Sequence, residues 1–244
     1  MQSATRSVKP GWIVLVVVAV YAIVMTVVAR DARAEIRELR LAAAENEAIA
    51  AARSEPRRAP AGVWFPVPGA SLPTDDAHLP GAPRAYRNGV SEGFDFYAGD
   101  AGVPIELGTP VVAAVAGTVT RSDRAYAEPD EAEWTALLGE VADGADASQL
   151  DRLRGRQLWI EGDDGRSYRY AHLDAIEPDL SVGDPVYRGQ VVATAGNSGT
   201  DDGVRGLTDG VRVHFEIWEN GDYFGAGLEP AAVRANAAAL FVGP

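Results

Sequence analysis

The chain has 244 residues, a formal net charge of −13, 47% hydrophobic residues and no cysteine. This length allows one ordinary domain with additional segments, and the hydrophobic fraction is sufficient for a buried core. The lack of cysteine excludes disulfide scaffolds, Cys-ligated zinc, iron–sulfur clusters and thiol catalysis. Residues 1–60 hold nine basic and six acidic residues, whereas residues 61–244 hold 13 and 29. A domain this acidic repels phosphate backbones, so we expect no nucleic-acid binding.

A short N-terminal tail, residues 1–11, leads into the uncharged apolar stretch WIVLVVVAVYAIVMTVVA at residues 12–29. About 20 apolar residues span a bilayer as a helix, so this stretch predicts a single transmembrane anchor. The alternative is a cleaved signal peptide, because Ala32-Arg33-Ala34 has the small-x-small pattern of a cleavage site. Signal-peptide cores are only ~7–15 residues long and a neutral region follows them, whereas Arg30 follows here at once; we therefore favour the anchor.

Residues 30–53 are rich in Ala, Glu and Arg and predict a helical stalk. Ile36, Leu39, Ala43 and Ala50 have a/d-like spacing, which leaves open a weak dimer seam beside the simpler interpretation of a solvated helix. The sequence SEPRRAPAG at residues 54–62 ends the helical pattern and predicts a linker.

From Val63 onward, short β-branched runs alternate with Gly, Pro and Asp. This pattern predicts a mainly β domain over residues 63–244, folded as an antiparallel sandwich or a partly open barrel. Residues 124–156 differ, because apolar residues recur there at helical spacing after Pro129; we expect a helical insertion with a second short helix at 148–153. A terminal helix is expected at 230–241.

Five segments of this domain carry groups suited to chemistry. In chain order they are SEGFD (91–95), YAHL (170–173), GDPVYRGQ (183–190), GNSG (196–199) and VRVHFEI (211–217). Side chains alternate along a strand, so Arg212, His214 and Glu216 lie on one face of their strand. In the same way, Ser91 and Asp95 lie on one face of theirs, and Glu92 points away from that face. Taken alone, His172 and His214 are more typical of structural histidines than of a site.

Together and in this order, the five segments resemble those of the LytM/lysostaphin-type zinc metallopeptidases, which cut peptidoglycan cross-links. The resemblance covers residues 63–227 apart from the insertion. It implies a zinc cofactor held at the positions of Ser91, Asp95 and His214, and catalytic histidines at the positions of His172 and Arg212. It also implies structural or groove-lining roles for Tyr170, Asn197 and Glu216.

Two of these positions depart from the family's pattern. A catalytic zinc normally has three protein ligands, and the Ser91 hydroxyl is a poor one. Arg212 brings a fixed positive charge that opposes a divalent cation and can fork to Asp95. Our hypothesis is that the Arg212–Asp95 pair replaces the metal, so that zinc is absent or weakly bound. His78 lies in a Pro/Asp loop, where we expect it to be solvated; the alternative is that it supplies the missing ligand.

These departures predict a non-catalytic, membrane-anchored domain of the LytM type, a pseudoenzyme that binds peptidoglycan or regulates and scaffolds a cell-wall hydrolase. The alternative is an active zinc metalloendopeptidase with a rewired metal site. A lipoyl-carrier module shares some of the turn motifs, but it needs an attachment lysine, and Lys9 in the tail is the only lysine of the chain. The insertion is the candidate for partner binding or for covering the groove.

The expected location is the bacterial cytoplasmic membrane, with a single pass and the C-terminal domain facing the cell wall. More basic residues follow the apolar stretch than precede it, and the positive-inside rule alone would place the domain in the cytoplasm. We place it outside because peptidoglycan lies there.

Overall fold

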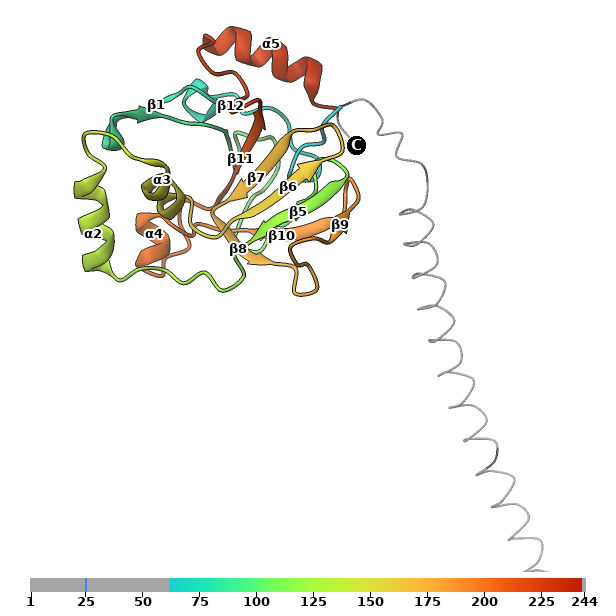
Figure 1. Cartoon of the computed structure of the whole chain (residues 1–244), viewed down its shortest axis with the longest axis horizontal. Helices are drawn as coiled ribbons and strands as arrows, with labels where there is room; N and C mark the ends of the chain where they lie inside the picture. The colour runs from blue at the N-terminus through green and yellow to red at the C-terminus, as the bar shows by residue number, and fades with distance from the viewer. Residues whose placement is uncertain (1–24, 26–61, 243–244) are drawn as a thin grey trace, which may run out of the picture. The chain divides into compact units, whose positions relative to one another are not determined.

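The computed structural model describes Met25 and residues 62–242 (Figure 1). The chain divides into two units, Met1–Pro56 and Arg57–Pro244, and the second contains the β domain. Apart from Met25 and Gly62, the predicted anchor, stalk and linker lie outside the described residues. Within the part of the chain that is described, no helix is long and apolar enough to cross a membrane.

Most strands belong to a large antiparallel sheet. Its path runs through β12 (Asp222–Tyr223), β11 (Arg212–Glu219), β7 (Ser167–Ala171), β6 (Leu158–Gly162), β5 (Gly117–Ser122) and β9 (Pro185–Val186), and β3 (Phe94–Tyr97) also pairs with β11. A three-stranded sheet contains β4 (Pro110–Val112), β10 (Val191–Ala195) and β8 (Leu173–Ile176), and a small ribbon joins β1 (Pro83–Arg84) to β2 (Gly89–Val90). The expected mainly β, antiparallel architecture is confirmed.

Strand β11 shows how the sequence divides the sheet into two faces. Val213, Phe215 and Ile217 are at most 2% exposed and pack into the core, as alternation along a strand requires. Arg212, His214 and Glu216 therefore point to the opposite face. The large sheet thus buries one face in the core and uses the other for the polar residues.

The described helices are short. They are the 3-10 turns η1 (Asp76–His78) and η2 (Ala85–Arg87) and the α-helices α2 (Glu131–Glu140), α3 (Ala147–Leu153), α4 (Asp201–Val204) and α5 (Pro230–Leu240). The predicted insertion at 124–156 contains α2 and α3, and Figure 1 shows both beside α4 at one end of the sheets. Each of the two begins with a capping box, at Asp130 and Asp146, in which the cap side chain accepts hydrogen bonds from backbone amides of the first turn.

The insertion has a small core of its own. Trp134, Leu137, Val141 and Leu153 pack together, separately from the main core. Leu153 ends α3, and the next residue, Arg154, turns toward the polar face of the large sheet. The insertion is therefore a compact unit that presents its C-terminal end to the site.

Candidate functional site

Sheet register brings the first site residues together. In the pairing of β3 with β11, Asp95 lies opposite His214, and in the pairing of β7 with β11, Ala171 lies on the other side of His214. The next residue, His172, joins β7 to β8 with φ of 57°, in the left-handed region that side chains other than glycine rarely adopt. Such backbone strain is held in place by surrounding contacts, and it aims the His172 ring at the polar face.

Asp95 is buried and surrounded by positive groups. Its Oδ1 lies 2.8 Å from His214 Nδ1 and 3.3 Å from Arg212 Nε, and its Oδ2 accepts a hydrogen bond of 2.6 Å from Arg84 Nη2. Burial alone would raise the pKa of the Asp95 carboxyl, but His214, Arg212 and Arg84 hold it well below its usual range. Asp95 is therefore a fully paired carboxylate.

Arg212 does contact Asp95, but it does not fork to it as the sequence hypothesis proposed. Its Nε is not aligned for a hydrogen bond with the carboxylate. Its Nη2 lies 2.6 Å from His172 Nε2, and its Nη1 donates to the Gly210 carbonyl oxygen at 3.3 Å. The bidentate arrangement was wrong because His172 and Gly210 take the two terminal nitrogens, while Arg84, which sequence reasoning missed, takes the second oxygen of Asp95.

His214 lies between two carboxylates. Its Nδ1 is 2.8 Å from Asp95 Oδ1 and its Nε2 is 3.1 Å from Glu216 Oε1. Because carboxylates only accept hydrogen bonds, this arrangement favours the ring with a proton on each nitrogen. Burial on its own would lower the pKa of His214, but Asp95 and Glu216 outweigh it and raise the pKa above its usual value.

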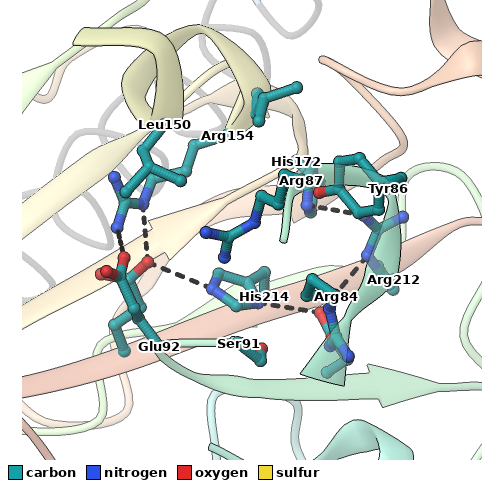
Figure 2. Close-up of a pocket in the computed structure, with 13 residues that line it drawn as sticks. Arg84, Tyr86, Arg87, Ser91, Glu92, Leu150, Arg154, His172, Arg212 and His214 are labelled. Carbon is teal, nitrogen blue, oxygen red and sulfur yellow. Dashed lines mark hydrogen bonds and ion pairs between the residues drawn. The ribbon is translucent and has the colours of Figure 1, made fainter. Parts of the chain in front are cut away.

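Glu216 connects His214 to the insertion. It is 1% exposed and accepts hydrogen bonds of 2.6 Å from Arg154 Nε and from Trp218 Nε1. Arg154 also pairs with Glu92, so one arginine holds two carboxylates (Figure 2). Burial would raise the pKa of Glu216, but its bonds with His214 and Arg154 keep it well below the usual range. The charges on this side of His214 are paired as completely as those around Asp95.

His172 has the opposite protonation state from His214. Its Nε2 faces Arg212, which can only donate, so Nε2 accepts and the ring proton is on Nδ1, which donates to the Ser198 carbonyl oxygen at 2.7 Å. Burial first, and then the charge of Arg212, lower the pKa of His172 well below its usual value. The only free lone pair of this neutral histidine therefore accepts a hydrogen bond from Arg212.

Residues 91–93 do not form a strand, and this corrects the expected direction of Glu92. Strand β3 begins at Phe94, after a bend at Glu92 and Gly93. A Cβ atom at Gly93 would lie 2.5 Å from the backbone oxygen of Phe215, so only glycine allows this close approach. Because of the bend, Ser91 and Glu92 both line the pocket, and the buried Ser91 hydroxyl donates to the Gly93 carbonyl oxygen at 3.1 Å.

Three other predicted residues lie away from the pocket centre. Tyr170 is fully buried in the core and its hydroxyl accepts a hydrogen bond from the Ala114 amide, so its role is structural. Asn197 is also buried, and its Nδ2 donates to Leu207 and Asp209 carbonyl oxygens, which fixes the loop after α4. His78 is not freely solvated as expected: its Nδ1 lies 2.7 Å from Asp100 Oδ2, outside the pocket.

The site residues surround a small cavity of about 60 Å³. A larger groove of about 420 Å³ continues from it, and the two share Tyr86, Leu153, His172 and Arg212. Leu150, Leu153 and Arg154 of the insertion line the small cavity, while Trp134 and Leu138 line the groove. The insertion therefore forms a wall of the site and leaves the groove open.

The donor set at the expected zinc position does not fit zinc. Arg84 and Arg212 pair with Asp95, and their fixed positive charges oppose a divalent cation, while both ring nitrogens of His214 face carboxylates. Ser91 adds only a neutral hydroxyl. Among residues 62–242, no group of three or more His, Asp or Glu side chains is arranged to hold a metal ion.

The sequence profile of Peptidase family M23 matches residues 98–225, a range that includes His172, Arg212 and His214. A zinc-containing peptidase from Vibrio cholerae is 23% identical, with a TM-score of 0.43 over 68% of this chain and 39% of that chain. Lysostaphin from Staphylococcus simulans is 18% identical, with a TM-score of 0.42 over 73% of this chain and 56% of that chain. The chain thus spans well under two thirds of the length of either protein. No match was found among curated protein sequences.

Proposed function

The chain belongs to peptidase family M23, and from this premise we propose that its domain acts at the bacterial cell wall without peptidase activity of its own. It binds peptidoglycan peptides, and through them it regulates or scaffolds a cell-wall hydrolase. The observation that carries this proposal is the pairing of Arg212 with both His172 and Asp95.

Metal-assisted hydrolysis needs a Lewis acid and a group that orients or deprotonates the attacking water. Arg212 counteracts both requirements. Its charge lies beside Asp95, where a zinc ion would need a negative ligand, and its Nη2 occupies the lone pair of His172 that would otherwise accept a proton. The arginine at position 212, where the family's pattern has a histidine, thus disfavours zinc binding and also prevents His172 from accepting a proton.

The alternative, a zinc endopeptidase with a rewired site, would need a substitute for the ligand lost at Ser91. His78 is paired with Asp100 and does not line the pocket. Glu92 does line it, but Arg154 holds its carboxylate. Either replacement would first have to break an ion pair, which supports the non-catalytic interpretation.

The location of the domain belongs to the same proposal. Residues 12–29 would anchor the chain in the cytoplasmic membrane, residues 30–53 would form a stalk, and the β domain would face the cell wall. The stalk would hold the pocket within reach of peptidoglycan, and its weak a/d-like pattern leaves room for a dimer.

Cosedimentation of the full-length chain with insoluble peptidoglycan tests the proposal. We expect the chain to sediment with the polymer and to release no soluble peptides, with or without added zinc. Release of peptides that a chelator abolishes would establish the endopeptidase alternative. Failure to sediment, together with no release, would overturn the proposed binding.

A further inference from the structure

We propose that the cavity beside His214 binds the terminal carboxylate of a peptide, while the preceding residues of that peptide lie in the adjoining groove. This inference rests on the proposed function, because it names the chemical group by which a non-catalytic domain would recognise cell-wall peptides. It is carried by the position of Arg87, by the size of the cavity and by the walls of the groove.

Positive groups outnumber negative ones around the cavity. Four arginines line it, against the three carboxylates of Glu92, Asp95 and Glu216. This excess occurs in a domain whose residues 61–244 contain 29 acidic and only 13 basic residues. A positive cavity in so acidic a domain selects an anionic group.

Arg87 is the arginine available to a ligand. Arg84, Arg154 and Arg212 each pair with a carboxylate of the site. For Arg87, no carboxylate partner is found in the described part of the chain, and its Nη2 donates to the backbone oxygen of Val90. Figure 2 shows its side chain reaching into the middle of the cavity, with the ion pairs arranged around it.

The size of the cavity suits a small anionic group. A volume of about 60 Å³ is enough to hold a carboxylate at the end of a longer ligand. A guanidinium forks to a planar carboxylate with two parallel hydrogen bonds, so Arg87 suits that group.

The groove that continues from the cavity suits the rest of a peptide. Tyr86, Tyr97, Trp134 and Leu138 give it an aromatic and aliphatic lining. Trp134 is fixed by its Nε1 bond of 2.6 Å to Asp201 Oδ1, and the Arg212 guanidinium lies 5.5 Å from the centre of the Tyr97 ring.

The rim of the groove restricts the charge of that peptide. Asp201 and Asp202 line the groove but not the cavity. Their negative charges oppose a polyanion that runs along the whole groove. The combination fits a chain that carries its negative charge at one end, which is a peptide with a free C-terminus.

Isothermal titration calorimetry with the full-length chain, which measures peptide affinity, tests this inference. The probes are a synthetic peptidoglycan stem peptide with a free C-terminal carboxylate and the same peptide with a C-terminal amide. Hydrogen bonds to charged groups contribute about 1.5–3 kcal/mol, so we expect the free acid to bind at least about tenfold more tightly than the amide. Equal affinity for the two peptides would overturn the inference.

Arg87→Gln should abolish the preference for the free acid. Arg124→Gln is the matched control, because Arg124 also donates to a single backbone oxygen, that of Pro178, and lies outside the cavity and the groove. Loss of the preference in both variants, or in neither, would contradict a role for Arg87. Inorganic phosphate that binds as tightly as the free acid would show a general anion site and would also overturn the inference.

The peptidoglycan sedimentation experiment separates this inference from the proposed function. If the chain sediments with peptidoglycan while the two peptides bind equally, the carboxylate inference fails and the proposed function stands. If the chain binds neither the polymer nor the peptides, both fail.

Discussion

The two sides of His214 differ in how the fold builds them. On one side, Asp95 and Arg212 come from β3 and β11, and sheet register places them against the histidine. On the other side, Glu216 is held by Arg154, which is supplied by the insertion. Strand pairing alone positions the first side, whereas the second side also needs an arginine from the insertion. The charge environment of His214 therefore depends on both the sheet and the insertion.

The two sides also differ in redundancy. Asp95 has Arg84, Arg212 and His214 around it, so no single group neutralises it. On the insertion side, Glu216 also has His214 and, at 3.7 Å, Arg169, but Arg154 is shared between Glu216 and Glu92. Loss of Arg154 therefore affects two carboxylates, whereas loss of Arg84 affects one, so we expect the larger cost for Arg154.

The largest effect is expected for Arg154→Ala. The variant leaves the buried Glu216 carboxylate without its closest cation, and breaking a buried ion pair from one side costs about 3–5 kcal/mol of unfolding free energy. Denaturant titration measures this cost. Arg152→Ala is the control, because its 3.9 Å pair with Glu140 is exposed and should contribute at most about 1 kcal/mol. An equal loss of unfolding free energy in the two variants would contradict the proposed role of Arg154 in holding Glu92 and Glu216.

A smaller effect is expected for Arg84→Gln on the strand side. Asp95 loses one charged hydrogen bond but keeps Arg212 and His214, so the expected loss of unfolding free energy is about 1.5–3 kcal/mol. The same denaturant titration applies. A cost above that of Arg154→Ala would reverse the proposed order of the two sides.

The smallest effect is expected for Asp130→Ala at the start of α2. The variant removes the side-chain cap of the helix, which contributes about 1 kcal/mol. It should leave the preference for a free-acid peptide unchanged, because Asp130 lies outside the cavity and the groove. If the preference disappears in this variant, α2 as a whole shapes the site, and the insertion acts through more than Arg154.

The strand side of the site could largely be predicted from the sequence. Alternation along VRVHFEI places Arg212, His214 and Glu216 on one face, and the family resemblance adds Asp95 and His172. The structure brings all five to the same cavity. The contact between Arg212 and Asp95 was also predicted, because the positions of both residues in the family's pattern belong to the same site and their charges are opposite.

The rest of the site depends on backbone geometry that a strand pattern does not contain. Glu92 was placed on the wrong side because the alternation rule was extended before Phe94, where the chain bends. Arg84 reaches Asp95 from the separate ribbon of β1 and β2. Arg154 directly follows a helix of the insertion, and no local motif specifies the direction in which its side chain points.

Zinc content and zinc affinity of the full-length chain, purified without a histidine tag, test the central claim most directly. The comparison is the Ser91→His/Arg212→His double variant, which restores the family's ligand and removes the opposing charge. We predict that the native chain holds no stoichiometric zinc, and that the double variant binds about one zinc ion per chain. One tightly bound zinc in the native chain would contradict the account, since it would require His214 and Asp95 to leave their present partners.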